Sequence, residues 1–103
     1  MIVTTTPLVE GYQIAEYLGI VAGDAMLGAK AVSDVFAAVT DLLGGQAGSY
    51  EQELAKARAT ALQDMEDQAD SLGATAIVGV NLTYGVINTV LMVTASGTAV
   101  RLG

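Results

Sequence analysis

Carboxylates are the side chains of this chain with the clearest capacity for chemistry, and Glu16 is the most unusual of them. It lies beside Tyr17 in residues 12–25, a stretch that is otherwise largely apolar. A carboxylate enclosed by apolar neighbours loses hydration unless a cation or donor pairs with it. We expect Glu16 to pair across a subunit contact with Lys30 or Arg101. A general acid or ligand anchor is the second interpretation, and plain exposure is the third.

Metal chemistry is restricted by composition, because none of the 103 residues is histidine or cysteine. Heavy and transition metals prefer thiolate and imidazole ligands, so only oxygen ligands of the magnesium or calcium kind remain. Glu16 and Asp24 are too far apart along one strand to share an ion within a subunit, although copies around a ring axis could bring carboxylates together. We therefore predict no metal site and no cofactor.

A second group of acids follows a helical spacing. It consists of Asp64, Glu66, Asp67 and Asp70. Such a run is typical of a solvated helix face rather than a cation patch. The methionines Met26, Met65 and Met92 are interpreted as filling the core rather than holding copper.

The stretch GGQAGSYEQE, residues 44–53, resembles a phosphate-binding loop only in its glycines. A Walker-type loop needs a lysine and a hydroxyl after its last glycine. Here Gly48 is followed by serine, tyrosine and glutamate, and the acids would repel a phosphate. We interpret the glycines as the point where two helices reverse direction.

The pattern of apolar residues predicts a single α+β domain over residues 1–103, in the order β-β-α-α-β-β. Strands are expected over residues 2–6, 12–25, 74–84 and 89–101, and helices over 30–43 and 49–72. The last two strands should form an antiparallel hairpin through the short link 85–88.

Three details of these elements are specific enough to test. Ser49, with Gln52 three residues later, is expected to cap the second helix. Both faces of strand 12–25 are largely apolar, so both are expected to be covered, and its glycines suggest a bulge or a close backbone approach. Five residues of strand 74–84 are expected to share one face: Ala76, Val78, Val80, Leu82 and Tyr84.

Composition also predicts self-association. Hydrophobic residues make up 52% of the chain and charged residues 15%, against about 25% charged in a typical domain. A contiguous apolar surface usually marks an interface. The net charge of −7, with only four basic residues, argues against nucleic acid and against an anionic membrane surface as partners. The chain shows no signal peptide and no membrane span, so we expect it in the cytoplasm.

A family resemblance rests on stretches spread over nearly the whole chain. They are TTP (5–7), EG (10–11), EYLGIVAGDAMLGA (16–29), GGQAGSYEQELAKAR (44–58), LGATAIVG (72–79) and LMVTASGTAV (91–100). In these the chain resembles the YbjQ family of uncharacterised bacterial and archaeal proteins, which carry a heavy-metal-binding description. The resemblance implies a dodecin-subunit-like fold that assembles into a pentameric ring.

This chain also departs from the family pattern. Relatives usually carry an acidic residue after the tyrosine that corresponds to Tyr84, and Gly85 stands there in this chain. The loop that follows, up to Thr89, is a few residues shorter, so no family role of that loop is carried over.

Three hypotheses for function follow. The first is a non-enzymatic homo-oligomer, a pentamer by resemblance, that holds a small unidentified ligand in a channel or at subunit junctions. The second is a metal-binding protein with oxygen ligands only. The third is an enzyme that uses Glu16 and Tyr17 for acid–base chemistry at a junction. The candidate ligand or junction residues are Glu16, Tyr17, Asp24 and Tyr84, and no catalytic residue is assigned.

Overall fold

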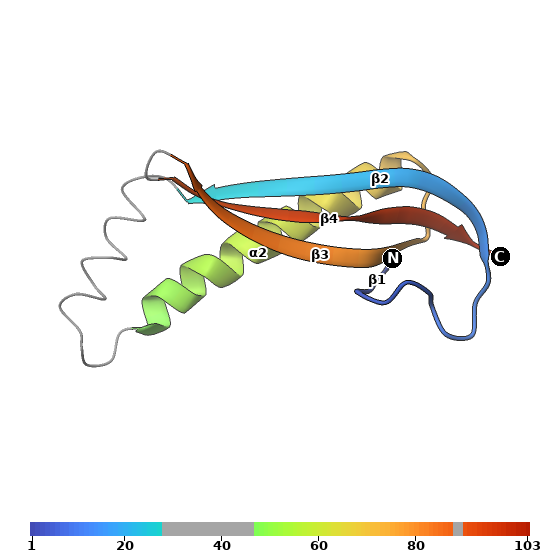
Figure 1. The fold of residues 1–103 in the computed structure, drawn as a ribbon, viewed down its shortest axis with the longest axis horizontal. Coiled ribbons are helices and arrows are strands. Elements are labelled where there is room, and N and C mark those ends of the chain that lie inside the picture. The colour runs from blue at the N-terminus through green and yellow to red at the C-terminus, as the bar shows by residue number, and fades with distance from the viewer. Residues whose placement is uncertain (28–46, 88–89) are drawn as a thin grey trace.

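The computed structural model describes residues 1–27, 47–87 and 90–103, and within these ranges the fold is one long helix on a four-stranded sheet (Figure 1). The elements are β1 (Ile2–Val3), β2 (Ile14–Leu27), α2 (Ala47–Ser71), β3 (Ala76–Ile87) and β4 (Val90–Leu102). The expected helix 30–43 and the first glycines of the glycine-rich stretch lie outside the described residues. The α+β class is confirmed.

The sheet is mixed, with the strand order β1-β3-β4-β2. β1 pairs in parallel with β3, whereas β3 with β4 and β4 with β2 are antiparallel. The hairpin predicted for the last two strands is confirmed, but β3 continues to Ile87. The residues expected to form a link therefore mostly belong to the strand. No described helix is long and apolar enough to cross a membrane.

The helix packs on β2 and β4 through a stripe of small side chains. Ala57, Ala61, Met65 and Ala69 recur every four residues and are buried against the sheet. Their spacing places them on one face of the helix. Because three of the four are alanines, the helix backbone can approach the sheet closely.

Gly23 of β2 is the point of closest approach. A Cβ atom at this position would overlap the backbone carbonyl oxygen of Ala61 and the backbone nitrogen of Met65. The absence of a side chain on the strand and the alanines on the helix therefore act together, and both are needed for this packing distance.

The ends of α2 agree with the sequence prediction at one end only. Gly73, at φ 80°, follows the helix and its N–H donates to Asp70 O at 3.0 Å, which is the glycine stop that was expected. At the other end the helix begins at Ala47, so Ser49 lies inside the helix. The prediction that Ser49 is the N-cap was wrong.

A bulge at Gly79 changes which residues of β3 share a face. Gly79 has φ 62°, and the pairing with β4 shifts register between Val78 and Asn81. Ala76 and Val78 consequently pack in a small cluster on the helix-free side, whereas Val80 joins the core beneath the helix. The expectation of a single shared face was wrong, because the extra residue reverses the alternation.

The bulge predicted in strand 12–25 is confirmed, since the register of β2 shifts between Tyr17 and Gly19. The prediction that both faces of this strand are covered was wrong for a single chain. The helix side is buried at Val21 and Leu27. On the opposite face Ile20 is 85% exposed, so one chain leaves half of this apolar strand in contact with solvent.

The close approach at Gly23 can be tested by substitution. Gly23→Ala should lower the free energy of unfolding by about 1–3 kcal/mol, because the added methyl group must push helix and strand apart. Urea denaturation followed by circular dichroism measures this change.

Gly85→Ala is the matched control, because a Cβ there meets nothing within 4 Å. It should be neutral or stabilise the chain by up to about 1 kcal/mol. Equal losses of stability in the two variants would contradict the proposed packing.

Candidate subunit-junction surfaces

Glu16 pairs with Arg101 of its own chain. The two residues are register partners on β2 and β4, and Arg101 Nη1 lies 3.3 Å from Glu16 Oε1. The Glu16 side chain is 48% exposed and the Arg101 side chain is 50% exposed. Arg101, one of the two expected partners, thus pairs with Glu16 within one chain rather than across a subunit contact, and the carboxylate is not enclosed in an apolar face. The alternative partner, Lys30, lies outside the described residues.

The four candidate residues do not form one site within a chain. Glu16 and Tyr17 lie near the start of β2, and Asp24 lies near its other end. Tyr84 is on β3, opposite Val93 of the helix-side core, and so lies on the other face of the sheet from Asp24. A shared site for these residues would need more than one copy of the chain.

Asp24 belongs instead to a hydrogen-bond network at the outer edge of β2. Its carboxylate Oδ1 accepts from the Thr94 hydroxyl at 2.8 Å, and its backbone N–H donates to Asp64 Oδ2 at 3.2 Å. Gln68 of the same helix accepts from the N–H of Ala22. Side chains of α2 thus accept hydrogen bonds from two outward-pointing backbone N–H groups of β2. This part of the strand edge is therefore less able to pair with another strand.

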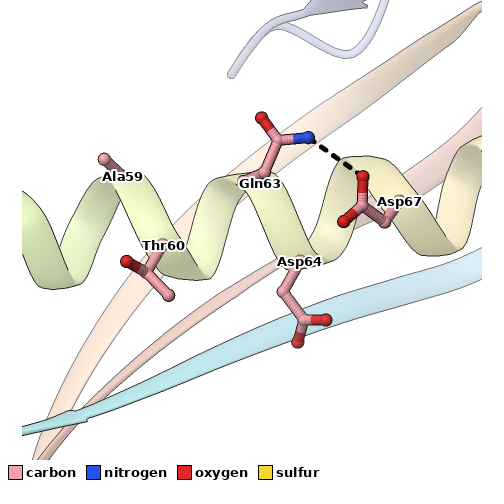
Figure 2. A pocket seen from close by; sticks show the side chains of 5 residues that line it. All are labelled: Ala59, Thr60, Gln63, Asp64 and Asp67. Carbon is pink, nitrogen blue, oxygen red and sulfur yellow. Dashed lines mark hydrogen bonds between the residues drawn. The ribbon is translucent and has the colours of Figure 1, made fainter.

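The acidic run on α2 is divided between this network and solvent. Figure 2 shows Asp64 directed towards β2, while Gln63 and Asp67 lie on another side of the helix and are joined by a 2.9 Å hydrogen bond. The surface hollow in this view is lined by residues of α2 alone: Ala59, Thr60, Gln63, Asp64 and Asp67. It is a stretch of helix surface and supplies no convergent groups from a second element.

The edge of β3 is much less protected. β1 pairs with β3 only at Ala76 and Ile77, and further backbone bonds from the N-terminal segment reach only as far as Val80. Among the described residues, no strand pairs with the outer side of residues 81–87. This segment, NLTYGVI, contains no charged residue and no proline, the features that usually protect an exposed edge.

Large apolar side chains are exposed along both edges of the sheet. On β3, Val86 is 66% exposed and Tyr84 is about half exposed; both lie on the helix side of the sheet, where α2 does not cover them. On β2, Tyr17 and Ile20 are exposed on the opposite face. We call Tyr84 and Val86 the β3 patch, and Tyr17 and Ile20 the β2 patch. They are two different surfaces on opposite edges of one sheet.

The donor groups of the chain do not fit a thiolate or imidazole metal site. The sequence contains neither cysteine nor histidine. Within residues 1–27, 47–87 and 90–103, no three acidic side chains gather closely enough to hold an ion. The divalent soft metals therefore lack the ligands that they prefer.

A family model described as "Putative heavy-metal-binding" matches residues 1–103. The chain belongs to the YbjQ family. A crystal structure of a protein of unknown function from Pediococcus pentosaceus, assigned to the DUF74 family, is similar over 100% of this chain and 98% of that one, with a TM-score of 0.56. At 19% identity, that likeness establishes a shared fold, and the family resemblance seen in the sequence is confirmed.

Sequence reasoning missed the β3 edge as a surface of interest. Val86 was placed in a link, and the protection of β2 by Asp64 and Gln68 was not foreseen. The absence of charged residues from 81–87 is the sequence feature that could have indicated an unprotected strand edge. The contacts of Asp64 and Gln68 were not predictable from sequence, because they depend on how α2 lies on the sheet.

The pair formed by Glu16 and Arg101 gives a second prediction. Glu16→Gln should change the free energy of unfolding by less than about 1 kcal/mol, because a half-exposed ion pair contributes little. The oligomeric state should be unchanged, since the partner of Glu16 is in its own chain. Urea denaturation and sedimentation velocity check both statements, and dissociation of an assembly by this variant would show that the carboxylate bridges subunits instead.

Proposed function

We propose that this YbjQ-family chain is a self-assembling protein whose copies join head to tail into a closed ring, with the β3 edge of one copy beside the β2 edge of the next. Five-fold closure is what the family resemblance implies. The ring would present its subunit junctions as the place for a small ligand. The observation that carries this proposal is the exposure of two different apolar patches on opposite edges of the same sheet.

The position of the patches favours a head-to-tail contact. When two different surfaces meet, the growing assembly keeps one free surface of each kind, one at each end, so assembly continues until the ring closes. A contact between two β2 edges about a two-fold axis would bring Glu16 of one copy towards Asp24 of the other in an acidic chain. The uncharged β3 edge avoids that repulsion, and its outward backbone groups over residues 81–87, which no described strand pairs, can pair with a neighbouring strand.

The part of β2 available to a neighbour is its first half. Beyond Ile20, the outward N–H groups of Ala22 and Asp24 are already bonded to helix side chains. A junction between β3 and residues 14–20 would bring Tyr84 of one copy and Tyr17 of the next to the same boundary, with Tyr84 on the helix side of the sheet and Tyr17 on the other face. Each tyrosine offers an apolar ring and a hydroxyl on its own face of the junction, and the nearby Glu16–Arg101 pair adds charge for a small polar ligand.

A mixing experiment tests the head-to-tail geometry. Val86→Lys should disable the β3 patch, and Ile20→Lys the β2 patch, because each places an ammonium group in an apolar contact. Each variant alone should sediment as a monomer. Mixed in equal amounts, they should form a heterodimer that cannot grow, since one intact patch of each kind remains.

Ala59→Lys is the control, since Ala59 is exposed on the outer side of α2 and should leave assembly unchanged. Native mass spectrometry of the mixture separates the possible outcomes. A mixture that remains monomeric, or a β3-intact variant that dimerises with itself, would contradict the head-to-tail ring.

A further inference from the structure

We propose that Met26 and Met92 form a thioether site for a soft monovalent cation, Cu(I) or Ag(I), on the helix-free face of the sheet. This inference does not depend on the ring. It rests on the register of two strands and on the donor chemistry that this chain retains.

The two methionines stand directly opposite each other. Met26 of β2 and Met92 of β4 are register partners, and such pairs have Cβ atoms about 4.5–5.5 Å apart. The neighbouring register pair, Ala25 and Val93, faces the helix-side core. Because side chains alternate along a strand, the two thioethers point to the opposite side, away from the helix.

Neither methionine is fully buried on that side. Met26 is 67% exposed, and Met92 is only partly buried. The next residue in the same row is Gly85 of β3, the register partner of Met92, and the space that its side chain would occupy is open. The pair therefore has room beside it for an ion and for further ligands such as water.

The placement of Met26 and Met92 differs from that of the chain's other methionines. Met65 is buried in the core beneath the helix. Met1 precedes β1, where the N–H of Ile2 donates to Thr75 near the other end of β4. The sequence interpretation grouped Met26, Met65 and Met92 as core filling, and that interpretation was wrong for Met26.

The chemistry of thioethers decides which cation fits. A thioether is a soft, neutral donor, and it is a characteristic ligand of Cu(I). Methionine has three flexible side-chain bonds, so two sulfurs can converge on one ion without backbone movement. With no thiolate or imidazole in the chain, Zn²⁺ has no comparable donors. The net charge of −7 raises the local concentration of any cation.

The direct test is titration of the full chain with Ag(I), and with Cu(I) under reducing conditions against a chromogenic competitor. Wild type should bind one ion per chain. Met26→Leu and Met92→Leu conserve volume, and each should weaken binding at least about tenfold, which is 1.4 kcal/mol. Met65→Leu, a buried control, should bind as wild type does. Zn²⁺ should give no binding at concentrations that saturate the Ag(I) site.

A second experiment looks for a gain of affinity at position 85, which lies beside Met92 and has open space for a side chain. Gly85→Met should tighten Ag(I) binding at least about tenfold by adding a third thioether, whereas Gly85→Leu, of similar size, should not. Unchanged Ag(I) binding in the Met26→Leu/Met92→Leu double variant, or equal affinities for Gly85→Met and Gly85→Leu, would overturn the proposal. Native mass spectra of the same samples report the subunit count, so failure of this site and failure of the ring are seen separately.

Discussion

The close contact between α2 and β2 at Gly23 determines which parts of the sheet α2 can cover. Alanines on the helix and a glycine on the strand allow a close fit, but the contact is narrow. A helix with its side chains is about 10–12 Å across, and neighbouring strands are about 4.8 Å apart. One helix therefore covers roughly two strands, β2 and β4, and leaves most of β3 and the opposite face of the sheet without cover from it (Figure 1).

As a consequence, the two edges of the sheet differ in how well their backbone groups are protected from pairing with another strand. Beside the helix, Asp64 and Gln68 bond the outward backbone donors of β2. β3 lies beyond the reach of such side chains, and its residues 81–87 carry no charge that would discourage pairing. A strand edge that no described strand pairs, beside exposed Tyr84 and Val86, is a surface that a second copy can cover. The composition of the chain, rich in apolar and poor in charged residues, agrees with that assignment.

The long helix and strands could be predicted from the sequence. The places where side chains stop alternating regularly between the two faces of a strand could not. The stripe of Ala57, Ala61, Met65 and Ala69 repeats at a helical spacing, so both the helix and its buried face were predictable. Gly79 and Gly85 look equivalent in sequence, yet only Gly79 adopts a positive φ and shifts the register of β3. Arg101 could be named as a partner of Glu16 from its charge, whereas their pairing within one chain depends on a register set by the whole sheet.

The central claim is that a single copy leaves apolar edges that other copies cover. Sedimentation velocity of the unmodified chain over a hundredfold range of micromolar concentration tests it most directly. The account predicts one stable species of two or more copies of the 10.5 kDa chain, with five copies as the family resemblance implies. A well-folded 10.5 kDa particle at every concentration would contradict it.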